Sequence, residues 1–260
     1  MFHLFFALLF LFCPSAAAED SLPAWQANAV AVDLPDYVAP MIAIVIDDMG
    51  LNRKMTQKAI ELPAPITTSF LPYAGDLERQ TARAGQAGHE LMLHLPMQPF
   101  SPRKNAGSGA LTVSMTESEI KTALDDALAA FDGYVGVNNH MGSRFTADSE
   151  LMRIVLDELN NRGLLFLDSV TSKHSTGYKV AQEIGMPAVA RQVFLDNTDE
   201  EIPIRLKDLE RFASKNGMAV GIGHPHQATI KALKNWMPDA AERGFVFVPV
   251  STIALYSAEE

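Results

Sequence analysis

Short apolar segments that end in polar side chains recur along this chain. The first covers residues 41–46, Met-Ile-Ala-Ile-Val-Ile, and runs directly into Asp47, Asp48 and, two residues later, Gly50. A run this short and this apolar predicts a strand that is buried on both faces, as in a parallel sheet. Side chains of adjacent strand residues point to opposite faces, so the two acids can share a site only where the strand breaks up. Gly50 favours such a break, although a plain Asp-Asp turn is the alternative.

Seven further segments predict strands, and they alternate with segments of helical periodicity. Strand patterns cover residues 66–71, 89–99, 134–140, 164–169, 188–195, 218–224 and 245–250. Helical patterns cover residues 51–61, 75–87, 116–131, 148–161, 176–185, 197–216 and 230–241. Thr116 and Glu119 form a capping box, and Asn197 with Glu200 predicts a similar cap. Residues 100–114 are rich in Pro, Gly and Ser and predict a long mobile loop, which in a compact domain is often functional.

Strand–helix alternation over the whole chain predicts an α/β fold with one parallel sheet. Seven or eight strands favour a single (β/α) barrel, and an open doubly wound sheet is the alternative. In either fold, the functional side chains gather at the carboxyl ends of the strands. No Gly-x-Gly-x-x-Gly motif follows the first strand and no Gly-Lys-Ser/Thr motif occurs, which argues against a nucleotide site.

Overall composition is ordinary, but the charge excludes some partners. The 260 residues are 48% hydrophobic and 20% charged, as expected of a globular protein with a sizeable core. The formal net charge of −10 and the lack of a basic stretch argue against a nucleic-acid partner. The same charge argues against attachment to anionic lipid.

The N-terminal segment has the pattern of a signal peptide. Residues 2–12 form an apolar run that is too short to span a membrane comfortably, and Ala16-x-Ala18 fits a signal-peptidase site. We expect residues 1–18 to be cleaved, which makes the mature protein secreted or periplasmic without a stable membrane span. An uncleaved N-terminal anchor is the alternative.

Cleavage at this site leaves a single predicted domain. Cys13 leaves with the signal peptide, so the mature chain has no cysteine for a disulfide or a thiolate nucleophile. Residues 19–40 contain three prolines and no clear periodicity, and we expect an extended lead-in there. The barrel domain is then predicted over residues 41–255.

Polar and ionisable residues stand at the ends of most of the predicted strands. A single strand-end histidine more often has a structural role, but several that converge at one rim of a barrel predict a functional site. Imidazole and carboxylate groups together suit Zn²⁺ and other divalent first-row metals. The candidates are Asp47, Asp48, His94, Gln98, Asn139, His140, Asp168, Asp196, His224 and His226.

Several of these residues lie in motifs that resemble the divergent polysaccharide deacetylases. These are distant relatives of the metal-dependent carbohydrate esterases that remove N- or O-acetyl groups from glycans. The resemblance covers residues 41–255, and its motifs are specific only in combination. They are Ile-Asp-Asp-Met-Gly at 46–50, His-Leu-Pro-Met-Gln-Pro at 94–99, Asn-Asn-His-Met-Gly-Ser at 138–143, Leu-Asp-Ser at 167–169 and Gly-His-Pro at 223–225.

The resemblance implies a barrel of the glycoside hydrolase/deacetylase type and a hydrolase that uses a divalent metal, with zinc the expected ion. By family position, Asp47 is the general base, Asp48 binds the metal and His224 is the general acid. His94 matches the first of two metal-binding histidines, after a Gly-His-Glu lead that this chain shares at 88–90.

The chain departs from the family pattern at two points. Gln98 stands where the second metal-binding histidine belongs, and an amide oxygen is a poor substitute for imidazole. His140, at the end of the next strand, supplies a candidate nitrogen, which makes Asp48, His94 and His140 the expected ligands. The Arg-x-Pro motif that orients the base has no clear counterpart. The residues expected to bind substrate are Gln98, Asn139, Asp168 and His226.

Three hypotheses follow from these residues. The first is a secreted metal-dependent glycan deacetylase. The second is a non-catalytic descendant that binds a glycan or a cell-envelope partner through the same rim. The third is a glycoside hydrolase that uses Asp47 or Asp48 together with Asp168 as its two carboxylates. The sequence leaves the substrate and the oligomeric state open.

Overall fold

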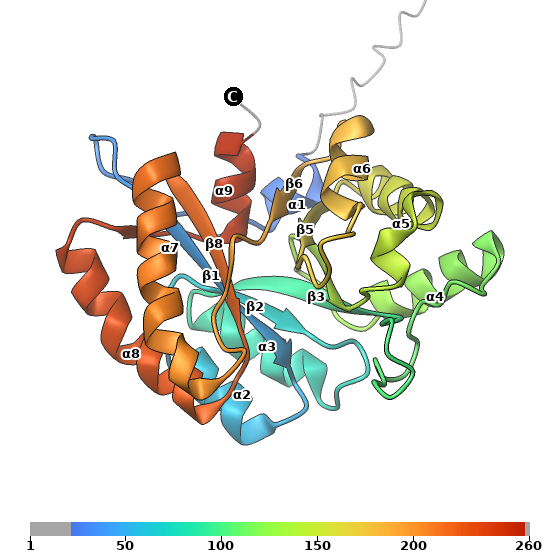
Figure 1. Cartoon of the computed structure of the whole chain (residues 1–260), viewed down its shortest axis with the longest axis horizontal. Helices are drawn as coiled ribbons and strands as arrows, with labels where there is room; N and C mark the ends of the chain where they lie inside the picture. Colours follow the sequence, from blue (N-terminus) through green and yellow to red (C-terminus); the bar gives the residue numbers. More distant parts are fainter. Residues whose placement is uncertain (1–21, 258–260) are drawn as a thin grey trace, which may run out of the picture.

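Parallel strands form the centre of the molecule, as the alternation predicts. The computed structural model describes residues 22–257, so the signal peptide predicted over residues 1–18 lies outside the described residues. Within them, eight parallel strands curl into a half-barrel in the order β6-β5-β4-β3-β2-β1-β8-β7, and β9 pairs with β1 (Figure 1). The predicted barrel class is therefore confirmed in half-barrel form. The strands are β1 (Met41–Met49), β2 (Thr67–Phe70), β3 (Glu90–Met97), β4 (Gly136–Met141), β5 (Leu165–Asp168), β6 (Ala188–Ala190), β7 (Val193–Phe194), β8 (Met218–Gly223) and β9 (Val246–Phe247).

Helices connect the successive strands, except β6 and β7, and cover the outside of the sheet. In Figure 1, α7 and α8 lie beside β8 at one end of the sheet, and α4 and α5 lie at the other end. The capping box predicted at Thr116 and Glu119 is confirmed at the start of α4. None of the described helices is both long enough and apolar enough to cross a membrane. The helices are α1 (Ala24–Ala27), α2 (Arg53–Ile60), α3 (Leu77–Gln86), α4 (Glu117–Leu128), α5 (Ser149–Asn161), α6 (Gly177–Glu183), α7 (Ile202–Asn216), α8 (Gln227–Glu242) and α9 (Val250–Ser257).

The two edge strands of the sheet are consecutive in the chain. The strand predicted over residues 188–195 is split into β6, which pairs with β5, and β7, which pairs with β8. Arg191 and Gln192 span the interval between these two pairings. The chain therefore passes directly from one edge of the half-barrel to the other, although β6 and β7 do not pair with each other. The single predicted strand was wrong because its two halves pair with opposite ends of the sheet.

The start of α7 also differs from the prediction. Asn197 and Glu200 do not form the expected cap, and a 3-10 turn over Asp199–Glu201 leads into the helix instead. Pro203 occupies the first turn of α7, where its missing N–H has no intrahelical partner to lose.

Two short helices close the amino-terminal ends of the strands. α9 begins at Val250, so the strand predicted over residues 245–250 was wrong at its carboxyl end. The backbone N–H of Val250 donates to Thr67 Oγ1 at 3.0 Å, a partner remote in sequence that no local pattern indicates. In the predicted lead-in, α1 buries Trp25 in the same apolar cluster as Ile253 of α9.

The interior of the half-barrel changes from apolar to polar along the strands. Because strand side chains alternate, every second residue faces the interior. The lower interior positions form one apolar cluster, which includes Ala43, Val45, Met92, Leu165, Leu167, Val220 and Ile222. The next interior position at the carboxyl ends is polar in each case: Asp47, Ser69, His94, Asn138, Ser169 and His224. The strand period alone therefore gathers these six side chains in one layer above the apolar cluster.

Glu90 is a buried carboxyl group at the opposite end of the half-barrel. Its Oε1 accepts hydrogen bonds from Thr67 Oγ1 at 2.9 Å and from the Ser251 N–H at 3.3 Å, whereas its buried Oε2 has no partner among the described residues. Burial raises the pKa of Glu90 from its ordinary value of 4.5 to about 7, although these hydrogen bonds oppose the shift. The folded chain therefore holds this proton more tightly than the unfolded chain does.

We expect Glu90→Gln to remove a pH dependence of stability. The contribution of protonated Glu90 to the free energy of unfolding is fully present below a pH of about 4.5 and is lost as the pH rises through about 7. Above that range the variant should be more stable than the wild type by on the order of 3 kcal/mol. Denaturant unfolding of both proteins across this pH range measures the difference. Glu242→Gln, at an exposed position, is the matched control, and a Glu90→Gln difference independent of pH would contradict the assignment.

Candidate metal and acid–base site

Two neighbouring aspartates share the site because the backbone of β1 is irregular between them. Asp47 continues the interior face of β1 and is buried. Asp48 would face the helices if β1 were regular, but its φ of 55° lies in the left-handed region. The β1–β2 register is also interrupted between Ile46 and Met49. Gly50 follows with a φ of 106°, and a Cβ at that position would lie 2.6 Å from the Cβ of a neighbouring alanine. The predicted break at the end of this strand is confirmed.

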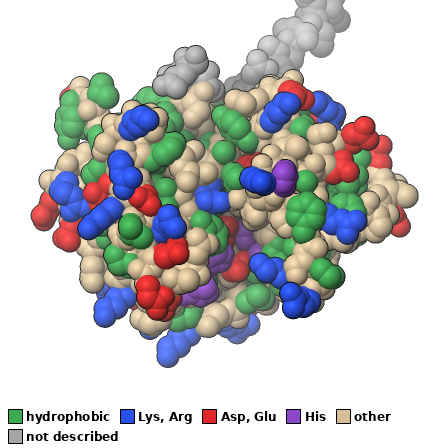
Figure 2. Space-filling view, in the orientation of Figure 1, with side chains coloured by type: hydrophobic (Ala, Val, Ile, Leu, Met, Phe, Trp, Pro, Cys, Tyr) green, Lys and Arg blue, Asp and Glu red, His purple; other side chains and the backbone are tan. Residues whose placement is uncertain are grey.

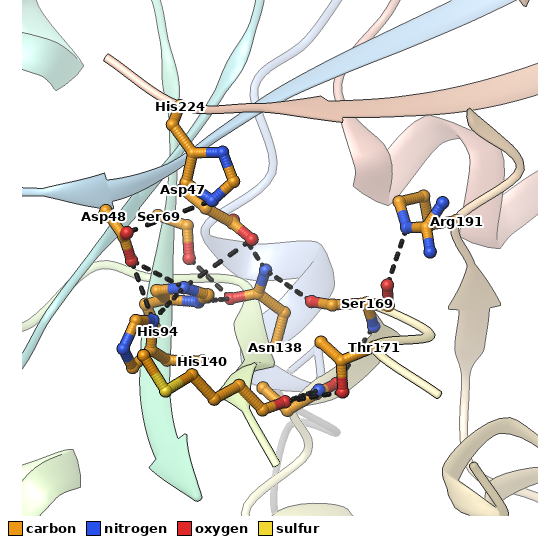
Figure 3. A network of polar contacts seen from close by, with 12 residues as sticks. Asp47, Asp48, Ser69, His94, Asn138, His140, Ser169, Thr171, Arg191 and His224 are labelled. Carbon is orange, nitrogen blue, oxygen red and sulfur yellow. Dashed lines mark hydrogen bonds and ion pairs between the residues drawn. The ribbon is translucent and has the colours of Figure 1, made fainter. Parts of the chain in front are cut away.

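Asp48, His94 and His140 bring three ligand-type atoms to one point (Figure 3). Asp48 Oδ1 lies 2.8 Å from His140 Nδ1 and 3.2 Å from His94 Nε2, and the two ring nitrogens are 3.2 Å apart. Tetrahedral coordination with ligand distances of about 2.0–2.2 Å separates neighbouring ligand atoms by roughly 3.4 Å. The spacing is close to that value, so the residues present fit a divalent ion.

The hydrogen-bonding pattern also fits a cation. Asn138 Oδ1 lies 2.7 Å from His94 Nδ1, so Nδ1 carries a hydrogen that it donates to Asn138, and Nε2 is turned toward Asp48. Asp48 Oδ1 is buried, yet no described residue donates an aligned hydrogen bond to it despite the short distances. Lone pairs that converge in this way repel each other unless a proton or a metal ion lies between them. Burial acts to raise the pKa of Asp48, but the His140 and His94 imidazoles outweigh it and hold the pKa far below its ordinary value.

Asn138 is the centre of the polar layer, and the sequence analysis gave it no role. Its Oδ1 accepts from Ser69 Oγ at 2.6 Å in addition to His94, and its Nδ2 donates to Asp47 Oδ1 at 2.7 Å and to Ser169 Oγ at 3.2 Å. The side chain is fully buried. One amide therefore fixes both a metal-ligand imidazole and the carboxylate expected to act as the base.

The pKa of Asp47 is shifted in the opposite direction to that of Asp48. Burial raises its pKa, and this effect outweighs the opposing influence of His94, His224 and the Asn138 hydrogen bond. Its Oδ2 lies 3.6 Å from His94 Nε2, beside the ligand cluster. A carboxyl group with a raised pKa next to a metal site has the properties of a general base.

A buried carboxylate, that of Asp196, holds His224 in place. Asp196 Oδ1 lies 3.0 Å from His224 Nδ1, and Asp196 Oδ2 accepts from the His224 backbone N–H and from Thr229 Oγ1, both at 2.7 Å. Burial opposes protonation, but Asp196 and then Asp47 and Asp48 outweigh it and raise the pKa of His224 to about 9. The imidazolium is therefore the stable form at neutral pH, and its Nε2 lies 3.9 Å from Asp48 Oδ2.

These groups line a cavity of about 780 Å³ at the carboxyl ends of the strands. Of the four residues predicted to bind substrate, Asn139 and His226 lie in its wall. Phe100 and Lys104, from the loop predicted over residues 100–114, line another part of the wall. The predicted involvement of this loop in the site is thus supported by its position.

Gln98 and Asp168 are not brought to the cavity. Gln98 Oε1 accepts from the Val113 N–H at 2.9 Å, so this side chain ties the loop after β3 to the sheet. Asp168 is buried and accepts from Ser175 Oγ and from the Val170 and Tyr178 N–H groups, which orders the turn after β5. The glycoside hydrolase hypothesis therefore lacks its second carboxylate.

The structure adds four site residues to those predicted. Ser69, Asn138 and Ser169 occupy the polar layer, and Arg191 lines the cavity from the connection between β6 and β7. Ser169 could have been found by extending the two-residue interior pattern one step past Leu167, the last apolar interior residue of its strand. Arg191 had no such signal because its position depends on the split strand.

A family model of the divergent polysaccharide deacetylases matches residues 44–254 of this chain. The chain belongs to this family. The resemblance inferred from the motifs is confirmed, and the match covers nearly the whole predicted domain. The family match agrees with the deacetylase-like fold, and the structure places in that fold a triad that could hold a metal.

Two of the proteins that this chain is similar to are uncharacterized, and a third, more distant in sequence, is a deacetylase. The chain is 35% identical over 202 residues to the uncharacterized protein YibQ of Escherichia coli, a match that covers 76% of this chain and 62% of that protein. Its structure is similar to that of the uncharacterized protein ATU2773 of Agrobacterium tumefaciens, with a TM-score of 0.86, 32% identity and coverage of 91% and 97%. The catalytic domain of a peptidoglycan N-acetylglucosamine deacetylase from Eubacterium rectale shares the fold at a TM-score of 0.53 and 12% identity, with 84% and 92% covered.

We expect His94→Ala to lose bound metal while the fold persists. Removing one of three ligands leaves a carboxylate and one imidazole, which hold zinc poorly. After dialysis against zinc and removal of free ion, elemental analysis should find about one zinc per wild-type chain and much less in the variant.

The exposed His174 provides the matched control, and His174→Ala should retain the wild-type zinc content. Circular dichroism monitors the fold of all three proteins. Equal, substoichiometric zinc in the wild type and in His94→Ala would show that the ligand assignment is wrong.

Proposed function

We propose that this protein is a metal-dependent hydrolase that removes acyl groups from a glycan, with zinc as its ion. The observation that supports this most strongly is the convergence of five groups in one cavity. A three-residue ligand cluster, a carboxylate of raised pKa and an imidazole of raised pKa are the set that such a hydrolysis requires. They are Asp48, His94, His140, Asp47 and His224.

Asp48, His94 and His140 would hold the ion. When bound there, a divalent metal would supply Lewis acidity toward an acyl oxygen and lower the pKa of a water molecule. In the family pattern, the second histidine stands four residues after the first, and in this chain Gln98 is at that position. The Gln98 side chain accepts a hydrogen bond from the Val113 N–H, so His140 would supply the second imidazole instead.

Two side chains divide the proton transfers between them. Asp47 has one oxygen fixed by Asn138, and its other oxygen is free to take a proton from water that attacks the acyl carbon. His224 enters the reaction as the imidazolium that Asp196 stabilises, and it donates that proton to the departing amine or alcohol.

Asp47→Asn should separate proton transfer from metal binding. The amide can still accept the hydrogen bond from Asn138, whereas it cannot take a proton from water. We expect wild-type zinc content with acetyl release lowered by about 10²-fold or more, because a positioned general base contributes about 10²–10⁴-fold. Acetate release from acetylated oligosaccharides, measured together with elemental analysis, checks both quantities.

Glu61→Gln, an exposed change elsewhere on the chain, is the matched control for this measurement. Acetyl release by Asp47→Asn at the wild-type rate would exclude Asp47 as the base. Zinc-loaded wild type that releases no acetate but binds the oligosaccharides would favour the non-catalytic glycan-binding hypothesis.

The site of action that we propose is the periplasm or the cell exterior. The apolar run over residues 2–12 and the Ala16-x-Ala18 pattern support export, and glycans of the cell envelope are accessible there. Exported protein should lack residues 1–18, and intact-mass spectrometry checks this directly. A mass that includes Met1 to Ala18 would instead favour a retained N-terminal anchor.

A further inference from the structure

A second cavity continues from the acid–base site onto the surface of α7. Its volume is about 570 Å³, and it shares Arg191, Phe194 and Asn197 with the wall of the first cavity. The connection passes His224 directly, because the Phe194 ring lies 5.3 Å from the His224 ring. A chain-like ligand held in the first cavity can therefore extend into the second.

The wall of this groove is basic although the chain as a whole is acidic. It contains four cationic side chains and one carboxylate, whereas the net charge of the chain is −10. Arg205, Asp208, Phe212 and Lys215 lie three or four residues apart on α7, so they form one stripe along the helix. Lys and Arg side chains, interspersed with Asp and Glu side chains, lie over α7 beside the hollow that contains the histidines (Figure 2). Charges beyond about 8 Å are largely screened at physiological salt, so the groove presents a positive surface locally.

Arg191 carries the charge nearest to the reaction centre. Its Nε and Nη2 donate to the carbonyl oxygens of Ser169 and Val170 at 2.6 and 2.7 Å, and the guanidinium lies 5.2 Å from the centre of the Phe194 ring. Within residues 22–257, no carboxylate lies within 4.0 Å of it. A half-buried guanidinium without a carboxylate partner is unusual in a folded protein. It is held rigidly and retains donors for an anionic ligand.

The α7 side of the groove supplies further cations in a fixed arrangement. Asp208 pairs with Arg205 at 3.3 Å and with Arg211 at 2.7 Å, and Glu201 also pairs with Arg205 at 3.0 Å, so carboxylates hold both guanidinium groups in place. Lys215 has no carboxylate partner among the described residues. The exposed ring of Phe212 lies among these charges and offers an apolar face of the kind that packs against sugar rings.

We propose that this groove binds an anionic group, a carboxylate or a phosphate ester, on the part of the glycan next to the acyl group that is removed. This inference rests on the proposed function and specifies its substrate class: an acidic glycan. Arg191 binds the anion at the junction of the two cavities, and the α7 stripe attracts the negative charge on the rest of the glycan. The overall negative charge suggests a neutral glycan, but the local charge of the groove favours an acidic one.

The test compares three oligosaccharides of equal length with zinc-dialysed, full-length protein at low salt. One is the neutral N-acetylglucosamine tetramer, one alternates N-acetylglucosamine with N-acetylmuramic acid and so bears carboxylates, and one is the neutral tetramer with a phosphate ester. Titration calorimetry should give at least one acidic probe an affinity about tenfold higher than that of the neutral tetramer. A preference for the carboxylate or for the phosphate probe identifies the anion, and either preference supports the proposal.

The double variant Arg211→Gln, Lys215→Gln removes two exposed charges from the groove and no residue of the acid–base site. We expect it to lose most of the tenfold preference and to bind the neutral tetramer as the wild type does. The matched control is Lys231→Gln, Lys234→Gln, which removes two exposed charges from α8 outside the groove and should keep the preference.

Equal affinity of the wild type for all three probes, no binding of any probe, or an unchanged preference in the double variant would overturn the proposal. Acetate release is measured on the same preparations. Release from the neutral tetramer without any preference for acidic probes refutes the groove alone. A preference that depends on the α7 charges without acetate release from any probe refutes the hydrolase alone and leaves the groove as an acidic-glycan binding site.

Discussion

The site depends on the hydrogen bonds of one buried amide. Asn138 accepts from His94 and Ser69 and donates to Asp47 and Ser169, so both its oxygen and its nitrogen are used fully in a region without solvent. Because its oxygen lies against His94 Nδ1, the opposite ring nitrogen keeps its lone pair for a ligand. Because its nitrogen holds one oxygen of Asp47, the other oxygen remains available. His94 and Asp47, the proposed metal ligand and the proposed base, are therefore positioned by the same group, and neither can be adjusted alone.

The strand pattern was sufficient to predict the architecture and most of the site. Apolar runs that end in Asp47, His94, His140 and His224 gave the parallel fold and the rim on which these side chains meet. Asn138 could not be recognised in this way, because its importance follows from the β3–β4 register that sets it opposite His94. Register is a tertiary property, and two adjacent asparagines at a strand end do not reveal which of them faces the interior.

Motif position was a less reliable guide than the strand period. Gln98 stands where a ligand belongs by family spacing, yet its side chain accepts a hydrogen bond from the backbone of Val113, and His140 on the next strand supplies the third atom of the candidate ligand cluster. The helix α9 and the split of residues 188–195 were missed for a related reason. Both are determined by partners distant in sequence, such as Thr67 for Val250, and not by local propensity.

The gap between the two edge strands links the fold to the groove. β6 and β7 are short, and next to them a side chain forms hydrogen bonds with backbone groups that neighbouring strands would bond in a longer pairing. Gln192 donates to the Ala190 carbonyl oxygen and accepts from the Val220 N–H, both at 2.6 Å. Arg191, from the interval between β6 and β7, and Phe194, from β7, line both cavities, so the two cavities meet where the edge strands are not paired with each other.

Backbone strain is concentrated around the same cavity. Asp48, Met141 and Val170 all have φ values between 46° and 55°, and such conformations cost on the order of 1–3 kcal/mol each for residues other than glycine. Val170 is the most unfavourable, since its side chain is β-branched. Its N–H donates to Asp168 Oδ1 and its carbonyl accepts from Arg191 Nη2, at 2.8 and 2.7 Å. Asp168 therefore acts on the site without touching the cavity, because it holds the turn that presents Ser169 to Asn138. The strained turn persists because a buried carboxylate and a guanidinium fix it from both sides, and the same guanidinium is the one that faces the groove.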